Sequence, residues 1–173
     1  MKTYFQKLFT GTKQEFVKQL ESCLKKKQRQ FIITANPETF MVGKKDEVLN
    51  RALLDPHTLV VADGIALVKT SKKFDVVCPK ITGVDITYEL FELANKFKKS
   101  LYLFGSTKEV ITKTVAKIKK DYPNIKVVGY CDGYVKDKDQ VFDEMVTKKP
   151  DVVLVALGIP QQEKLIYQNL SRF

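Results

Sequence analysis

Short apolar runs recur along the chain, separated by longer segments in which apolar residues stand three or four positions apart. The runs are continuous rather than alternating, which is typical of strands buried on both faces. They cover residues 31–34, 58–62, 101–104, 126–129 and 151–157. The last run is the longest and gives the strongest strand prediction.

The segments between the runs have the period of an amphipathic helix. One stripe consists of Ile86, Leu90, Leu93, Ala94 and Phe97, and a second of Ile111, Val115, Ile118 and Tyr122. Residues 12–15 and 106–109 each fit a capping box, in which a hydroxyl and a glutamate satisfy unpaired amides at a helix start. Pro160 suits the first turn of a final helix, because its missing N–H costs nothing there.

This alternation predicts the fold class α/β, with an open, mostly parallel, Rossmann-like sheet and helices on both faces. No linker or repeat divides the chain, so residues 1–173 are predicted to form a single α/β domain. In such folds ligands bind beyond the carboxyl ends of the strands. The residues that follow each strand are therefore the candidates for function.

The charge balance indicates an anionic partner but does not identify which one. Lys and Arg total 30 against 20 Asp and Glu, for a net charge of +10. The only arginines are Arg29, Arg51 and Arg172, and lysine gives a hydrated positive surface rather than bidentate clamps. A phosphate-bearing substrate, an anionic membrane and nucleic acid all fit, as does a lysine-rich exterior that serves solubility alone.

The cysteine and histidine content argues against a zinc site and against Cys-His or Ser-His-Asp catalysis. Cys23, Cys78 and Cys131 are far apart, and His57, in a predicted turn, is the only histidine. The first ten residues lack the apolar core of a signal peptide, and no stretch approaches the roughly 20 apolar residues of a membrane span. We expect free thiols, no resident metal and at most peripheral membrane contact.

Polar residues follow the first two strands. Thr34 and Asn36 stand at the end of the first, and Asp63 directly follows the second. The Asn-Pro pair fits either a turn that starts a helix or a polar cluster at a ligand. Asp63 fits either a general base or a helix N-cap, and the pattern alone leaves both open.

Three further candidates precede the next predicted helix. Lys80 fits a phosphate contact, and Gly83 would let a substrate approach the backbone closely. The alternative is a solvated lysine and a glycine turn, with Asp85 as a helix cap.

The loops after the third and fourth strands hold weaker candidates. Gly105 and Ser106 open a helix N-terminus, which can bind an anion, although no P-loop pattern is present. Asp132 begins an Asp-Gly turn, and an exposed Tyr134 could stack on a base. A nearby Asp137-Lys138-Asp139 resembles the D-x-D of metal-dependent sugar transferases, but it is more typical of a helix cap on a solvated face.

The fifth strand leads into Gly158, Gln162 and Glu163. An amide and a carboxylate at a helix start can hydrogen-bond a sugar or a nucleobase. Ordinary capping of the final helix is the alternative.

Taken together, these segments resemble the TagA/WecG/CpsF family of bacterial glycosyltransferases. The matching pieces are Thr34-Ala-Asn-Pro-Glu38, Ala62-Asp-Gly64, Thr82-Gly-Val-Asp85, Leu103-Phe-Gly105, Asp132-Gly-Tyr134 and Leu157-Gly-Ile-Pro-Gln-Gln-Glu163. Each piece is weak alone. Their order and spacing match from about residue 30 to the end of the chain, which makes the combined signal specific.

The resemblance implies an inverting, metal-independent glycosyltransferase without cofactors. It would move N-acetylmannosamine or a related acetamido sugar from UDP to the 4-hydroxyl of N-acetylglucosamine on undecaprenyl diphosphate, in wall teichoic acid or surface polysaccharide synthesis. By similarity, Asp63 is the general base, and Thr34 and Asn36 hold the sugar or acceptor. Gly105, Tyr134 and Gln162 line the UDP side.

Two features depart from the family pattern. Lys80 stands where the family tends to have arginine, which keeps the charge but loses the bidentate fork. Family members also continue with a glycine-rich strand and a basic, amphipathic part that docks on the membrane, whereas this chain stops at Phe173. The resemblance therefore implies a cytoplasmic protein at the inner face of the cell membrane, and a nearly inactive one in this truncated form. Apolar surface that the missing part would leave exposed is compatible with a homo-oligomer.

A different class of function is also compatible with the charge. The chain would then be a non-catalytic nucleotide- or nucleic-acid-binding α/β module. Single-strand binders interleave aromatic residues with arginine, and that pattern is missing here, so we expect no nucleic-acid partner. A structural scaffold is a third possibility, in which Asp63 would matter only for stability.

Overall fold

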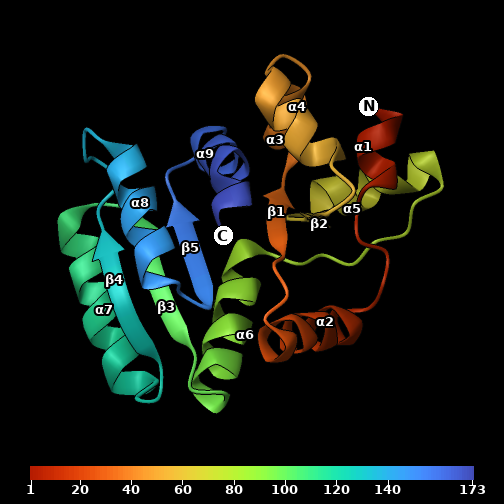
Figure 1. The fold of residues 1–173 in the computed structure, drawn as a ribbon. Coiled ribbons are helices and arrows are strands. Elements are labelled where there is room, and N and C mark those ends of the chain that lie inside the picture. The colour runs from red at the N-terminus through yellow and green to blue at the C-terminus, as the bar shows by residue number, and fades with distance from the viewer.

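The computed structural model describes residues 1–173, and its strands form two parallel sheets (Figure 1). In the first sheet β1 (Phe31–Ala35) pairs with β2 (Thr58–Ala62). The second has the order β4-β3-β5, from β3 (Ser100–Gly105), β4 (Lys126–Cys131) and β5 (Val152–Ala156). All five predicted strands are confirmed, with bounds shifted by at most two residues.

Helices surround both sheets (Figure 1). They are α1 (Lys2–Gln6), α2 (Lys13–Lys26), α3 (Pro37–Gly43), α4 (Glu47–Leu54), α5 (Ile65–Ser71), α6 (Gly83–Lys96), α7 (Lys108–Asp121), α8 (Lys138–Lys148) and α9 (Gln161–Asn169). Short 3-10 turns follow α5 at Lys72–Phe74 and α9 at Leu170–Arg172. No helix is both long enough and apolar enough to cross a bilayer.

The α/β class and the parallel strands are confirmed, but the strands are divided between two sheets instead of forming one. Helices connect the halves, because α6 contacts β5 and α9 contacts β1. The arrows of β1, β4 and β5 point the same way in Figure 1. Since pairing within each sheet is parallel, the carboxyl ends of all five strands face the same side of the molecule.

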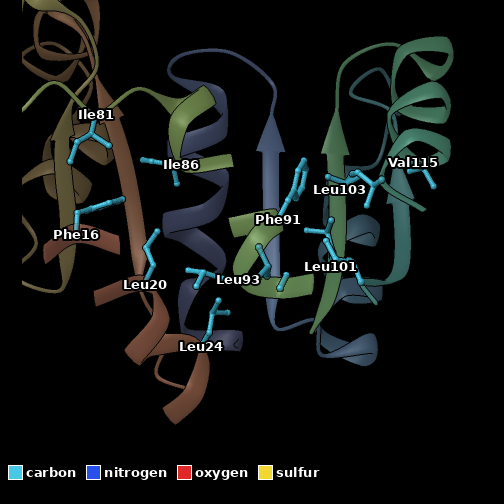
Figure 2. Close-up of a cluster of buried hydrophobic side chains, with 14 of the residues drawn as sticks. Phe16, Leu20, Leu24, Ile81, Ile86, Phe91, Leu93, Leu101, Leu103 and Val115 are labelled. Atoms are coloured by element: carbon cyan, nitrogen blue, oxygen red, sulfur yellow. The ribbon is translucent and has the colours of Figure 1, made fainter. Parts of the chain in front are cut away.

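The largest apolar cluster continues from one sheet to the other (Figure 2). Val61 of β2 and Leu103 of β3 both belong to it, together with side chains of α2, α6 and α7. The two predicted helical stripes supply much of it: Ile86, Leu93, Ala94, Ile111, Val115 and Ile118 are all buried. This shared core holds the two sheets together, since burying apolar surface is the main favourable term in folding.

Helix starts follow the predicted chemistry at one position and differ at another. The capping box of α2 is confirmed: Thr12 Oγ1 accepts from the Glu15 amide at 3.1 Å, and Glu15 accepts from the Thr12 amide at 2.7 Å. The box predicted at 106–109 is wrong, because Thr107 is the N-cap of α7. Ser106 instead adopts a left-handed conformation with φ 60° and extends the turn that Gly105 begins.

Candidate active site

Asp63 lies where three backbone segments meet at the end of the first sheet. Its amide donates to the carbonyl of Ala35 at 2.7 Å, and the Ile81 amide donates to the carbonyl of Ala62 at 3.0 Å. The Asp63 Oδ2 atom accepts a hydrogen bond from the Gly83 amide at 3.2 Å. The carboxylate is therefore half-buried and held toward the start of α6, while Gly64, not Asp63, is the N-cap of α5.

Thr34 faces the same point from β1. A Cβ placed on Gly83 would lie 3.6 Å from Thr34 Oγ1 and 3.8 Å from Asp63 Oδ2. Thr34, Asp63 and Gly83, which are distant in sequence, thus surround one small space. A Cβ on Gly83 would make ordinary van der Waals contact with both side chains. That Gly83 lets a substrate approach the backbone stays a prediction.

The neighbouring candidates also have structural roles. Asn36 Oδ1 accepts from the Thr39 amide at 2.9 Å and caps α3, so only its Nδ2 remains for a ligand. Asp85 completes a capping box with Thr82 at the start of α6, and the amide of Thr82 lowers the pKa of the Asp85 carboxyl. Lys80 is exposed beside Ala62, with its ammonium group in no ion pair.

A second group of candidates gathers at the end of the other sheet. Gly105 has φ 127°, and a Cβ there would lie 2.1 Å from the carbonyl oxygen of Ala156. The Ser106 amide donates to that oxygen at 3.0 Å, and the Gly133 amide donates to the carbonyl of Ser106 at 2.8 Å. The β3, β4 and β5 loops are thus locked together by main-chain contacts.

The β4 loop holds its predicted residues at the surface. Asp132 Oδ1 accepts from the Tyr134 amide at 2.9 Å, the Asx turn typical of an Asp-Gly pair. Tyr134 is 79% exposed, so its ring is free to stack on a ligand. Asp137 caps α8 by accepting from the Gln140 amide at 3.0 Å, which agrees with the capping alternative at this D-x-D.

Gln162 is bound to its own loop. Its Oε1 accepts from the amides of Leu157 at 3.2 Å and Gly158 at 3.1 Å, and its Nε2 donates to Glu163 Oε1 at 2.8 Å. Glu163 is only 3% exposed, and its Oε2 has no hydrogen-bond partner. The pair fixes the loop after β5 and leaves one buried carboxyl oxygen unsatisfied.

A cavity of about 1200 Å³ lies between the two sheets. Six predicted residues line it: Thr34, Gly83, Gly105, Ser106, Gln162 and Glu163. Seven do not: Asn36, Asp63, Lys80, Asp85, Asp132, Tyr134 and Gly158. Asp63 adjoins the cavity through its bond to Gly83. Most of the lining is apolar, as is usual for small-molecule sites.

Sequence reasoning missed several residues of this site. Thr87 and Tyr88 of α6 line the cavity, as does Ile166 of α9. Thr87 lies four residues after Gly83, and Ile166 lies four residues after Gln162. This spacing was the available signal for these two, because residues three or four apart share a helix face. Gly133 was also missed as a contact: a Cβ there would lie 3.3 Å from the Gly105 Cα.

The buried Glu163 carboxyl gives a pH-dependent prediction. Burial raises its pKa above the usual range, so the folded state holds this proton more tightly than the unfolded state. Its contribution to stability is therefore largest below the ordinary carboxyl pKa and falls as the pH rises through the folded-state pKa. We expect Glu163→Gln to raise the free energy of unfolding by about 1–3 kcal/mol at pH 8 and to change it little at pH 4.

Urea denaturation across this pH range checks the expectation. Glu89→Gln on the exposed side of α6 is the matched control and should show no such pH dependence. A change in the free energy of unfolding of the same size at both pH values would contradict the raised pKa of the Glu163 carboxyl.

Comparison with known sequences places these motifs in a family. The sequence model of the glycosyl transferase WecG/TagA/CpsF family matches residues 4–173. The chain is 37% identical over 160 residues to the N-acetylglucosaminyldiphosphoundecaprenol N-acetyl-beta-D-mannosaminyltransferase of Bacillus spizizenii, covering 91% of this chain and 62% of the relative. The enzyme of the same name from Bacillus subtilis is 40% identical over 143 residues, covering 82% and 56%.

A more distant relative with the same name, from Staphylococcus aureus, is 29% identical over 145 residues, covering 83% of this chain and 56% of the relative. The chain thus spans 56–62% of the length of these relatives. The family match itself covers nearly every residue described above. This chain belongs to the WecG/TagA/CpsF family of glycosyl transferases.

Proposed function

We propose that this chain forms the α/β part of an inverting, metal-independent glycosyltransferase. The donor is UDP-N-acetylmannosamine or a UDP-linked relative, and the acceptor is N-acetylglucosamine carried on undecaprenyl diphosphate. The product would serve wall teichoic acid or surface polysaccharide synthesis at the inner face of the cell membrane. The names of the relatives support this acceptor and this sugar.

The observation that carries the proposal is the meeting of Thr34, Asp63 and Gly83 at the edge of the cavity. A half-buried carboxylate beside an open glycine can accept the proton of a hydroxyl group that lies over that glycine. Thr34, which lies beside Gly83, and the free Nδ2 of Asn36 at the end of β1 would orient the hydroxyl-bearing sugar.

In the reaction, Asp63 takes the proton from the acceptor 4-hydroxyl, and the oxygen forms a bond to the anomeric carbon of the donor. The bond from that carbon to the UDP oxygen breaks on the opposite face, so the configuration inverts. A positioned base of this kind contributes about 10²–10⁴-fold to the rate. Lys80 places its positive charge near the diphosphate, and Asp85 holds the start of α6 beside it.

The second group of residues would hold the nucleotide. Gly105 and Ser106 present a turn at the start of α7, where unpaired amides favour anions. Tyr134 offers its exposed ring to uracil, next to the turn made by Asp132. The loop fixed by Gln162, with Gly158 and Glu163, closes the same side of the cavity.

Transfer assays with and without a chelator test this function. We expect the protein to form the disaccharide lipid from UDP-N-acetylmannosamine and a lipid-linked N-acetylglucosamine, with unchanged rate in excess EDTA. The reason is that the diphosphate contacts we propose come from a lysine and backbone amides, and no group of three metal-ligating side chains is brought together. A loss of activity in EDTA that added Mg²⁺ or Mn²⁺ restores would contradict the metal-independent mechanism.

A further inference from the structure

The buried carboxyl group of Glu163 has a hydrogen-bonding capacity that the protein itself does not use. The residue lies in the first turn of α9 and is only 3% exposed. Its Oε1 accepts from Gln162 Nε2 at 2.8 Å, whereas its Oε2 has no partner. The ammonium group of the next residue, Lys164, is paired with Asp46 at 2.5 Å. Because a buried polar atom without a partner is costly, such an atom beside a cavity points to a ligand.

Glu163 lies where a ligand would pass from one group of candidate residues to the other. Helix α9 follows β5 of the second sheet and contacts β1 of the first. Glu163 lines the cavity between the sheets together with Thr34 and Gly83 of the reaction point and Gly105 and Ser106 of the nucleotide side. The donor sugar joins the nucleotide to the reacting carbon, so it has to cross this part of the cavity.

The wall beside Glu163 restricts the chemical group that fits there. Ile166 follows by three residues, on the same face of α9, and lines the same cavity. A fitting group therefore has a hydrogen-bond donor next to an apolar part. In an acetamido group the N–H and the methyl group lie on the same edge of a planar amide. A sugar hydroxyl lacks the methyl group, and the imide N–H of uracil lies between two carbonyl groups that an apolar wall would leave unpaired.

We propose that Glu163 selects donors whose sugar carries an acetamido group: Oε2 accepts from the N–H of that group, and the acetyl methyl group packs against Ile166. The inference rests on the proposed function, which supplies the UDP-linked sugar. The carboxyl group is oriented in advance, because Gln162 binds its other oxygen and is itself held by the amides of Leu157 and Gly158. Only the soft terminal torsion of the glutamate has to adjust when the ligand binds.

Glu163→Gln separates this contact from the structural role of the residue. The glutamine oxygen can still accept from Gln162 Nε2. Its NH₂ group then takes the place of Oε2 and meets the N–H of the ligand, where two donors cannot pair. The variant is expected above to be more stable than the wild type at pH 8, so a loss of selectivity would not be a loss of folding.

Calorimetry with three ligands tests the proposal. They are UDP, UDP-N-acetylmannosamine and the UDP-linked 2-deoxy analogue, which has hydrogen in place of the acetamido group. We expect the wild type to prefer the acetamido sugar about 100-fold over the analogue, and Glu163→Gln to reduce this preference to about tenfold, since a hydrogen bond to a charged group is worth about one decade or more. UDP and the analogue should bind both proteins alike.

Glu89→Gln is the matched control. It makes the same change of charge on the exposed side of α6, at a residue that does not line the cavity. This variant should keep the full preference for the acetamido sugar. Circular dichroism and urea denaturation check that both variants are folded.

Equal affinity of the wild type for the two sugar nucleotides would overturn the proposal without any variant, as would an undiminished preference in Glu163→Gln. A loss of affinity shared equally by UDP and both sugar nucleotides would assign Glu163 to the loop alone and also overturn it. In each of these cases UDP binding by the wild type leaves the proposed function standing. A wild type that binds neither UDP nor a sugar nucleotide would count against the proposed function, and this inference would fall with it.

Discussion

Asp63→Asn is expected to lower the rate of sugar transfer by about 10²–10⁴-fold while leaving the fold intact. Asparagine keeps the size of the side chain, and its amide oxygen can still accept from Gly83. It cannot take a proton from the acceptor hydroxyl. The loss should therefore appear in kcat, with UDP affinity unchanged.

Steady-state transfer assays and UDP calorimetry on the same preparation check this result. Asp139→Asn is the matched control, because Asp139 is an exposed carboxylate in the first turn of α8. The control should transfer sugar at the wild-type rate. Turnover by Asp63→Asn within a few-fold of wild type would remove the general-base assignment, and a large loss in Asp139→Asn would revive the D-x-D hypothesis.

Gly105→Ala is expected to destabilise the protein by about 3–5 kcal/mol, because the new methyl group meets backbone that cannot move cheaply. Its Cβ would lie 2.1 Å from the Ala156 oxygen and 2.5 Å from the Ala156 carbonyl carbon. The φ of 127° adds strain for any L side chain. The contact lies where β3 pairs with β5, so relief requires the strands to separate.

Gly64→Ala separates the two causes of this effect. Gly64 has φ 110°, and a Cβ there meets nothing within 4 Å. Only the conformational strain remains, which costs about 1–3 kcal/mol. Urea denaturation of both variants measures the difference. Equal losses at Gly105 and Gly64 would contradict the close approach of β3 and β5.

The strands were predictable because each is a continuous apolar run buried on both faces. Their division into two sheets was not predictable, because an apolar run does not show which other strand it pairs with. The contacts of α6 with β5 and of α9 with β1 arise only when the chain has folded. Likewise, Ser106 fits a capping box by spacing, yet it adopts a left-handed conformation and Thr107 is the N-cap of α7.

The candidate site divides in a similar way. The rule that ligands bind beyond strand ends located both groups of residues, and the structure brings Thr34, Asp63 and Gly83 together. The sequence did not reveal that Gln162 uses both ends of its amide within its own loop. Nor did it distinguish the buried Glu163 from an ordinary first-turn glutamate, since burial depends on the packing of α9.

A crystal structure with a bound UDP-sugar tests the central claim most directly. The account predicts that the nucleotide lies along the turns at Gly105 and Tyr134, with the anomeric carbon turned toward the Asp63 carboxylate and room for a hydroxyl between them. A sugar held at the amino ends of the strands, or with Asp63 far from its anomeric carbon, would contradict it.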